Sequence, residues 1–150
     1  MNNDKWNRRF IELCLHIAQW SKDPSTKVGA VIVRPDKTIA SLGYNGFPAG
    51  IDDKPEFYEN KEIKMRHVVH AEMNAILHSN ENLSNTSLYV SHFPCKDCIK
   101  LIVQKKIKKV FVCVKEEYNN PNNYHVRAKE DIEMTKEVYK NVCEFIEVKV

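Results

Sequence analysis

The segment Pro94-Cys95-Lys96-Asp97-Cys98 constrains this chain most, because cysteines three positions apart share one face of a helix. Pro94 favours a helix that begins here, since its missing N–H would have no partner in the first turn. Thiolates at such a helix start are stabilised by the helix dipole, which lowers their pKa. Taken alone, the pair is open to three interpretations: a redox couple, half of a zinc knuckle, or coincidence.

A second segment, His70-Ala71-Glu72, precedes residues 71–78, whose pattern predicts a helix. Two helix starts could therefore bring His70, Cys95 and Cys98 to one metal ion. Three ligands are the number of a catalytic zinc site, whereas a closed structural site takes four. Glu72 is a poor fourth ligand, because side chains two apart on a helix point to opposite sides. In a first turn it can instead reach a bound substrate as an acid–base group. A structural zinc with a surface glutamate is the alternative.

The remaining cysteines, Cys14, Cys113 and Cys143, lie singly within apolar patterns and are interpreted as small core residues. Five cysteines are an odd number, and the charged N-terminal residues do not resemble a signal peptide. We therefore expect reduced thiols and a cytoplasmic location.

The charge balance argues against a polyanionic partner. The 150 residues include 23 Lys and Arg and 20 Asp and Glu, which gives a net charge of +3. The lysines between positions 96 and 109 are interpreted as a solvated helix end, with a nucleotide or nucleic-acid patch as the alternative. No apolar run approaches the roughly 20 residues that span a bilayer.

Hydrophobic periodicity predicts one domain over residues 1–150 in which strands alternate with helices. The expected helices cover residues 4–20, 71–78, 95–105 and 129–141. The expected strands cover residues 28–33, 38–44, 88–90, 110–114 and 145–150, the first two forming a hairpin. Residues 43–50 form a glycine-rich loop, and residues 52–65 are polar and ambiguous. This alternation favours a three-layer α/β fold with helices on both faces of the sheet.

Together, the two segments match the zinc-deaminase signature H-x-E…P-C-x-x-C. With residues 23–33 and the loop Gly43 to Gly50, they make the chain resemble the cytidine and deoxycytidylate deaminase superfamily, and more closely its deoxycytidylate branch. The resemblance implies a cytidine-deaminase-like α/β/α fold with a central five-stranded mixed sheet. The chain departs from the family at Lys105-Lys106, where a small residue and a glycine are common.

The resemblance also implies a function, the hydrolytic deamination of dCMP to dUMP and ammonia in the supply of dTTP. It makes His70, Cys95 and Cys98 the ligands of one Zn²⁺ and Glu72 the proton shuttle to ring N3 and the leaving amino group. The substrate contacts that it implies are Asn45 to the sugar, the backbone of Ala71 to the pyrimidine, and Tyr118. The 5′-phosphate needs a cation, for which Lys27, Lys115 and Arg127 are candidates.

Members of this branch are often hexamers that dCTP activates and dTTP inhibits, with Mg²⁺ on the triphosphate. By resemblance, Gly43, Tyr44, Asn45 and Gly46 are candidate effector-binding residues. Three alternatives stay open: a deaminase of free cytidine or deoxycytidine, a tRNA- or DNA-editing deaminase, and a zinc-binding protein without catalysis. A membrane partner is not expected, and nucleic acid is disfavoured.

Overall fold

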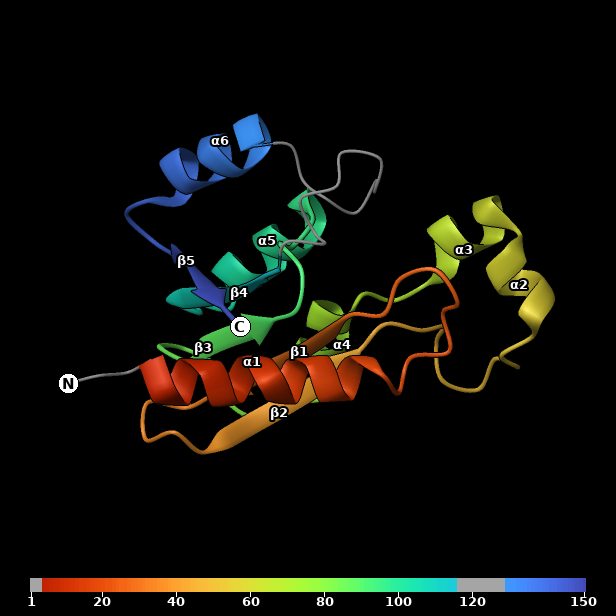
Figure 1. Ribbon diagram of the computed structural model, residues 1–150, viewed down its shortest axis with the longest axis horizontal. Coiled ribbons are helices and arrows are strands. Elements are labelled where there is room, and N and C mark those ends of the chain that lie inside the picture. Colours follow the sequence, from red (N-terminus) through yellow and green to blue (C-terminus); the bar gives the residue numbers. More distant parts are fainter. Residues whose placement is uncertain (1–3, 116–128) are drawn as a thin grey trace.

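The apolar run that the sequence places near residue 30 forms the strand β1 (Gly29–Val33), and all five of its residues are buried. The computed structural model describes residues 4–115 and 129–150. In these residues β1 belongs to a five-stranded sheet of order β2-β1-β3-β4-β5 (Figure 1). The other strands are β2 (Ile39–Tyr44), β3 (Ser87–Val90), β4 (Lys109–Val114) and β5 (Glu144–Lys149). β1 pairs antiparallel with β2 and β3, whereas β3, β4 and β5 run parallel, so the sheet is mixed as expected.

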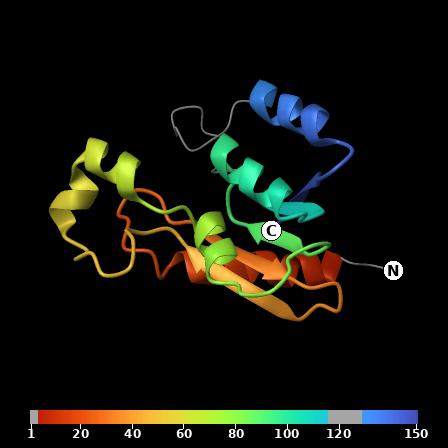
Figure 2. The same ribbon diagram turned by 180° about the vertical axis from the view of Figure 1, so that it is seen from behind.

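Helices cover both faces of the sheet, which confirms the three-layer prediction. α1 (Asp4–Ala18) lies in front of the sheet in Figure 1 and behind it in Figure 2. Its apolar stripe packs on Val31, Tyr89 and Phe111. The opposite core receives side chains from α4 (Ala71–Leu77) and α5 (Lys96–Gln104), and Tyr139 of α6 (Lys129–Tyr139) packs against it. Cys14, Cys113 and Cys143 are buried in these cores, as predicted.

The expected elements are confirmed to within about two residues at most ends, but the sequence prediction missed two helices. The ambiguous segment forms α2 (Pro55–Glu59) and α3 (Lys61–His67), which project from one end of the molecule in both views (Figures 1 and 2). Five and seven residues are too few to display a helical period. Only local signals mark them: Pro55 opens α2, and the Asn60 side chain caps α3 by accepting the N–H of Ile63 at 3.1 Å.

Two local features differ from the expectations, and a third concerns the Lys105-Lys106 departure noted in the sequence. α1 ends at Ala18 rather than residue 20, because Gln19 and Trp20 donate to carbonyls three residues back. Pro94 stands before the N-cap residue Cys95 and is not the first helical residue. Lys106 has φ 62°, the left-handed region that glycine favours, at the position where the family resemblance leads to an expectation of glycine.

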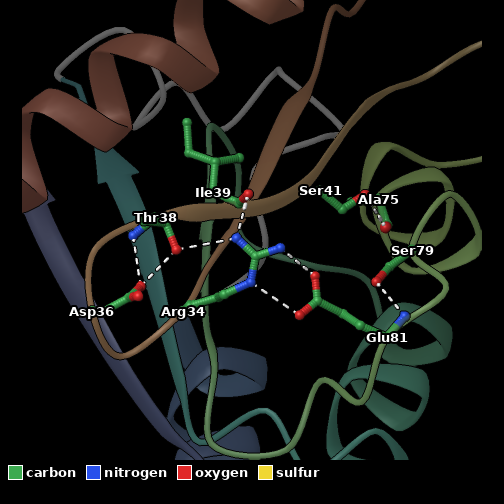
Figure 3. Close-up of polar contacts among 8 residues, drawn as sticks. All are labelled: Arg34, Asp36, Thr38, Ile39, Ser41, Ala75, Ser79 and Glu81. Atoms are coloured by element: carbon green, nitrogen blue, oxygen red, sulfur yellow. Dashed lines mark hydrogen bonds and ion pairs between the residues drawn. The ribbon is translucent and has the colours of Figure 1, made fainter.

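The hairpin turn between β1 and β2 is tied to the segment after α4 by the Arg34 guanidinium (Figure 3). Arg34 Nε and Nη2 donate to the two carboxylate oxygens of Glu81 at 3.0 and 2.5 Å. Nη1 donates to Thr38 Oγ1 and to the Ile39 carbonyl oxygen at 3.1 and 2.8 Å. This group of contacts organises the end of the β1–β2 hairpin that carries the turn.

No helix in the described part of the chain is both long enough and apolar enough to cross a membrane.

Candidate active site

His70 and Cys95 occupy equivalent positions, because each is the N-cap residue of a helix that covers the same face of the sheet. Their backbones are extended, with φ −71°, ψ 154° at His70 and φ −72°, ψ 164° at Cys95. Neither side chain makes a capping bond to its helix within the described residues. Cys98 follows in the first turn of α5 and is fully buried. The local structure therefore directs three soft or borderline donors toward one point.

The donor atoms of these three residues lie within 4.8 Å of one another. His70 Nδ1 is 3.4 Å from Cys95 Sγ and 3.4 Å from Cys98 Sγ. Zinc–sulfur bonds of about 2.3 Å and zinc–nitrogen bonds of about 2.0 Å place tetrahedral N and S ligands about 3.5 Å apart. The geometry and chemistry of the donor set therefore fit Zn²⁺.

The pKa values of the two thiols are shifted in opposite directions. Hydrogen bonds from Cys98 and His70 lower the pKa of the Cys95 thiol to about 3. The pKa of Cys98 is raised, chiefly because it donates to Cys95 and because it is buried. Cys95 is therefore the thiol of the pair that ionises more readily. A bound zinc ion requires both thiolates, so its binding releases the Cys98 proton.

Glu72 lies in the first turn of α4 with only 4% of its surface exposed. Burial raises the pKa of its carboxyl group, while His70 and a hydrogen bond with Cys98 act in the opposite direction. Glu72 is not one of the three clustered donors. Its position therefore suits proton transfer beside a metal better than coordination of the metal.

A cavity of about 670 Å³ opens beside this group, within the roughly 300–1,000 Å³ typical of small-molecule sites. Five residues singled out from the sequence line it: Asn45, His70, Ala71, Glu72 and Cys95. Lys27 and Lys115 are outside the lining that the described residues form. Tyr118 and Arg127 lie outside the described residues.

Sequence reasoning missed three lysines that line the cavity, Lys61 and Lys64 on α3 and Lys96 on α5. α3 carries no strong sequence signal, so its side chains could not be assigned to a site. Lys96 was interpreted only as part of the solvated lysine run. Three residues of α6 also line the cavity, namely Asp131, Met134 and Thr135.

The end of β2 and the loop that follows it connect the elements around the site. A Cβ at Gly43 would come within 2.5 Å of the Ala71 carbonyl oxygen, so glycine allows β2 to approach the start of α4. The N–H of Asn45 donates to Val28 O, and Gly46 and Val69 exchange two backbone bonds directly before His70. Tyr44 remains exposed, edge-on to Trp20 with ring centroids 6.1 Å apart.

A three-layer α/β domain with one histidine, two cysteines and an adjacent buried glutamate has the composition of a zinc deaminase centre. The family model described as the cytidine and deoxycytidylate deaminase zinc-binding region matches residues 4–114. The chain belongs to this family.

Individual relatives agree with this assignment. An uncharacterized deaminase from the luxG 3′ region of Aliivibrio fischeri is 44% identical over 107 residues, covering 71% of each chain. Human deoxycytidylate deaminase is 42% identical over 112 residues, covering 71% of this chain and 63% of the human protein.

A solved structure shows the same fold. The dCMP deaminase of cyanophage S-TIM5, in complex with dCMP and dUMP, superposes with a TM-score of 0.71 at 24% identity, covering 95% of this chain and 96% of that one.

Proposed function

We propose that this chain is a zinc-dependent deaminase that hydrolyses dCMP to dUMP and ammonia. The observation that carries the proposal is the buried Glu72 carboxyl group beside the His70–Cys95–Cys98 group, at the wall of a cavity of nucleotide size. The names of the curated relatives supply the substrate class, since human deoxycytidylate deaminase is 42% identical to this chain. The product would enter the supply of dTTP.

His70, Cys95 and Cys98 would hold the zinc ion, which when bound supplies a water molecule of lowered pKa as the nucleophile. Glu72 would take a proton from the attacking water and deliver it to ring N3, so that C4 becomes electrophilic and the water oxygen forms a bond to C4. The Glu72 carboxylate would then take the remaining proton from the hydroxyl group on C4 and pass it to the exocyclic amino group. The C4–N bond breaks, ammonia leaves, and the C4 carbonyl of dUMP forms. Burial in the cavity wall raises the Glu72 pKa toward the working pH, which suits a group that serves first as base and then as acid.

The remaining substrate contacts follow from the cavity and from the family resemblance. Asn45 would meet the sugar, and the backbone of Ala71 would meet the pyrimidine, since both residues line the cavity. Tyr118 stays a candidate for a further contact. For the 5′-phosphate, Lys61, Lys64 and Lys96 at the cavity wall join Lys27, Lys115 and Arg127 as candidate cations.

Ammonia release from dCMP, cytidine, adenosine and single-stranded DNA tests this proposal directly. We expect turnover of dCMP, much slower turnover of cytidine, and one zinc ion per chain in protein purified without added metal. Turnover of cytidine alone would indicate a nucleoside deaminase, and turnover of adenosine or DNA an editing enzyme. Bound zinc without any turnover would indicate a non-catalytic metal protein.

The proposal extends to a hexamer that dCTP activates and dTTP inhibits, with Mg²⁺ on the effector. Two exposed rings near the β2 loop, Tyr44 and Trp20, offer surfaces on which a base can stack. The N–H groups of Asn45 and Gly46 are already bonded, which leaves the Tyr44 ring as the main contact that this loop offers. dCMP saturation curves with and without each nucleotide at fixed Mg²⁺ test this. A typical coupling changes dCMP affinity about 5- to 150-fold, whereas identical curves would refute regulation.

A further inference from the structure

The spacing of Cys95 and Cys98 is also that of a redox couple, and the two thiols are unequally accessible. Cys95 is half-buried and lines the cavity. Cys98 is fully buried, and it is not part of the lining that the described residues form. In a C-x-x-C couple, an accessible cysteine at a helix start reacts with a reagent, and the second cysteine then displaces that reagent. The structure gives Cys95 the first of these positions and Cys98 the second.

The two sulfur atoms are close enough to form a bond after rotation of their side chains. They lie within 4.8 Å of each other, because the N-cap residue and the third residue of α5 share one side of its first turn. A disulfide bond is about 2.05 Å long. Cys95 precedes the regular turns of α5, and its side chain makes no capping bond that rotation would break. We therefore expect the bond to form without a rearrangement of α5.

The other three cysteines are protected by the fold. Cys14, Cys113 and Cys143 are at most 3% exposed, and none of them belongs to the cavity lining that the described residues form. Burial raises the pKa of the Cys143 thiol to about 11 and raises the pKa of the Cys14 thiol as well. A reagent that enters the cavity of the folded chain therefore meets the thiol of Cys95 and none of these three.

We propose that Cys95 and Cys98 are a modification site for low-molecular-weight disulfides, at which oxidation and zinc binding exclude each other. The Cys95 sulfur attacks one sulfur of the reagent, whose S–S bond breaks, so that a mixed disulfide forms and one reagent thiol leaves. The Cys98 sulfur then attacks the Cys95 sulfur, which forms the Cys95–Cys98 disulfide and releases the second reagent thiol. The two cysteines lose two electrons and two protons, which reduce the reagent to two thiols.

The product has no thiolate left for a metal ion, because zinc is bound by deprotonated cysteine sulfur. Conversely, thiolates that are bound to zinc are withheld from the reagent. This inference rests on the proposed zinc ligands of the deaminase, but it does not depend on the substrate.

Oxidised glutathione, added to the full-length chain with zinc bound and after removal of zinc by a chelator, tests the proposal. Alkylation and peptide mass spectrometry then locate the reacted thiols. We expect the Cys95–Cys98 disulfide to form at least about tenfold faster in the zinc-free protein. The oxidised protein should take up no zinc until a reducing agent is added. Circular dichroism, together with protection of Cys14, Cys113 and Cys143 from alkylation, establishes that the chain is folded.

Two variants, compared in zinc-free form because each lacks a proposed ligand, test the order of the steps. Cys98→Ser should stop at the mixed disulfide of Cys95 with glutathione. Cys95→Ser should react at least about tenfold more slowly, because its remaining thiol is buried. Cys143→Ser is the matched control: it removes a cysteine outside the pair and should form the disulfide at the rate of the wild type.

Several outcomes would overturn the proposal. These are a folded zinc-free wild type that forms no Cys95–Cys98 disulfide, glutathione attached to Cys98 before Cys95, and an oxidised pair that still binds zinc. If the zinc-free chain unfolds, zinc release from the loaded protein takes its place. Each zinc ion that oxidised glutathione releases should then be matched by one Cys95–Cys98 disulfide, and release without that disulfide refutes the inference. None of these measurements uses dCMP, so absence of turnover would refute the proposed function alone.

Discussion

Two ion pairs lie near the two ends of the β1–β2 hairpin, one at its turn and one beside the segment that leads into β1, and they differ in what surrounds them. At the turn, Arg34 and Glu81 form a two-point pair whose side chains are 36% and 38% exposed (Figure 3). At the other end, Asp23 is buried and Lys64 is half-buried at the cavity wall, and Asp23 also accepts two backbone N–H groups. Water solvates the charges of the first pair and so weakens their attraction. The second pair is largely shielded from water, so its charges depend on their protein partners for compensation.

The difference indicates which of the two ion pairs tolerates substitution of one partner. Removal of one partner from a buried pair leaves an uncompensated charge, but an exposed group is resolvated when its partner is lost. The ion pair at the turn therefore stabilises only the residues around it. At the cavity end, one carboxylate links a loop, the helix α3 and Asn45, so a change there reaches the site. Three predictions sharpen this contrast.

The largest effect is expected at the cavity end, on catalysis. Glu72→Ala should keep the fold and the zinc ion but lose about 10²- to 10⁴-fold in turnover, the usual contribution of a positioned acid–base group. Glu81→Ala removes a glutamate at the turn end and is the matched control, with turnover close to that of the wild type. Loss of zinc from Glu72→Ala would show that Glu72 is a ligand and would contradict the role assigned to it.

A smaller effect is expected on stability, and it compares the two pairs directly. Lys64→Met leaves the Asp23 charge buried without its cation and should lower the free energy of unfolding by about 3 kcal/mol. Glu81→Gln should lower the unfolding midpoint much less, because Arg34 is resolvated. Urea unfolding at pH 7 measures both variants. Equal losses would show that burial does not distinguish these pairs.

The same comparison has a pH dependence at the turn. The hydrogen bond from Arg34 lowers the Glu81 pKa below its ordinary 4.5, so the folded state favours the ionised carboxylate. The contribution is therefore present above about pH 4.5 and is lost as pH falls through the lowered pKa. The difference between wild type and Glu81→Gln should shrink over that range. A constant difference down to strong acid would contradict the assignment.

Much of the fold was predictable because its signals are local. The β-branched run of β1 and the apolar stripe of α1 each reflect burial of a single element, and the structure confirms both. The metal group was predictable for the same reason, since the spacing of Cys95 and Cys98 and the position of His70 before a helical stretch depend only on helix geometry.

By itself, the sequence determined the alternation of strands and helices, the three donors that fit zinc, and Glu72 as their acidic neighbour. Only the tertiary structure decided which side chains complete the cavity. Asp23 meets Asn45 across 22 positions and Lys64 across 41. Lys64 belongs to a helix of seven residues without a readable period. Periodicity records which face of an element is buried, but it carries no information about which distant element covers that face. Polar partners across the cavity therefore emerge only when the chain is folded.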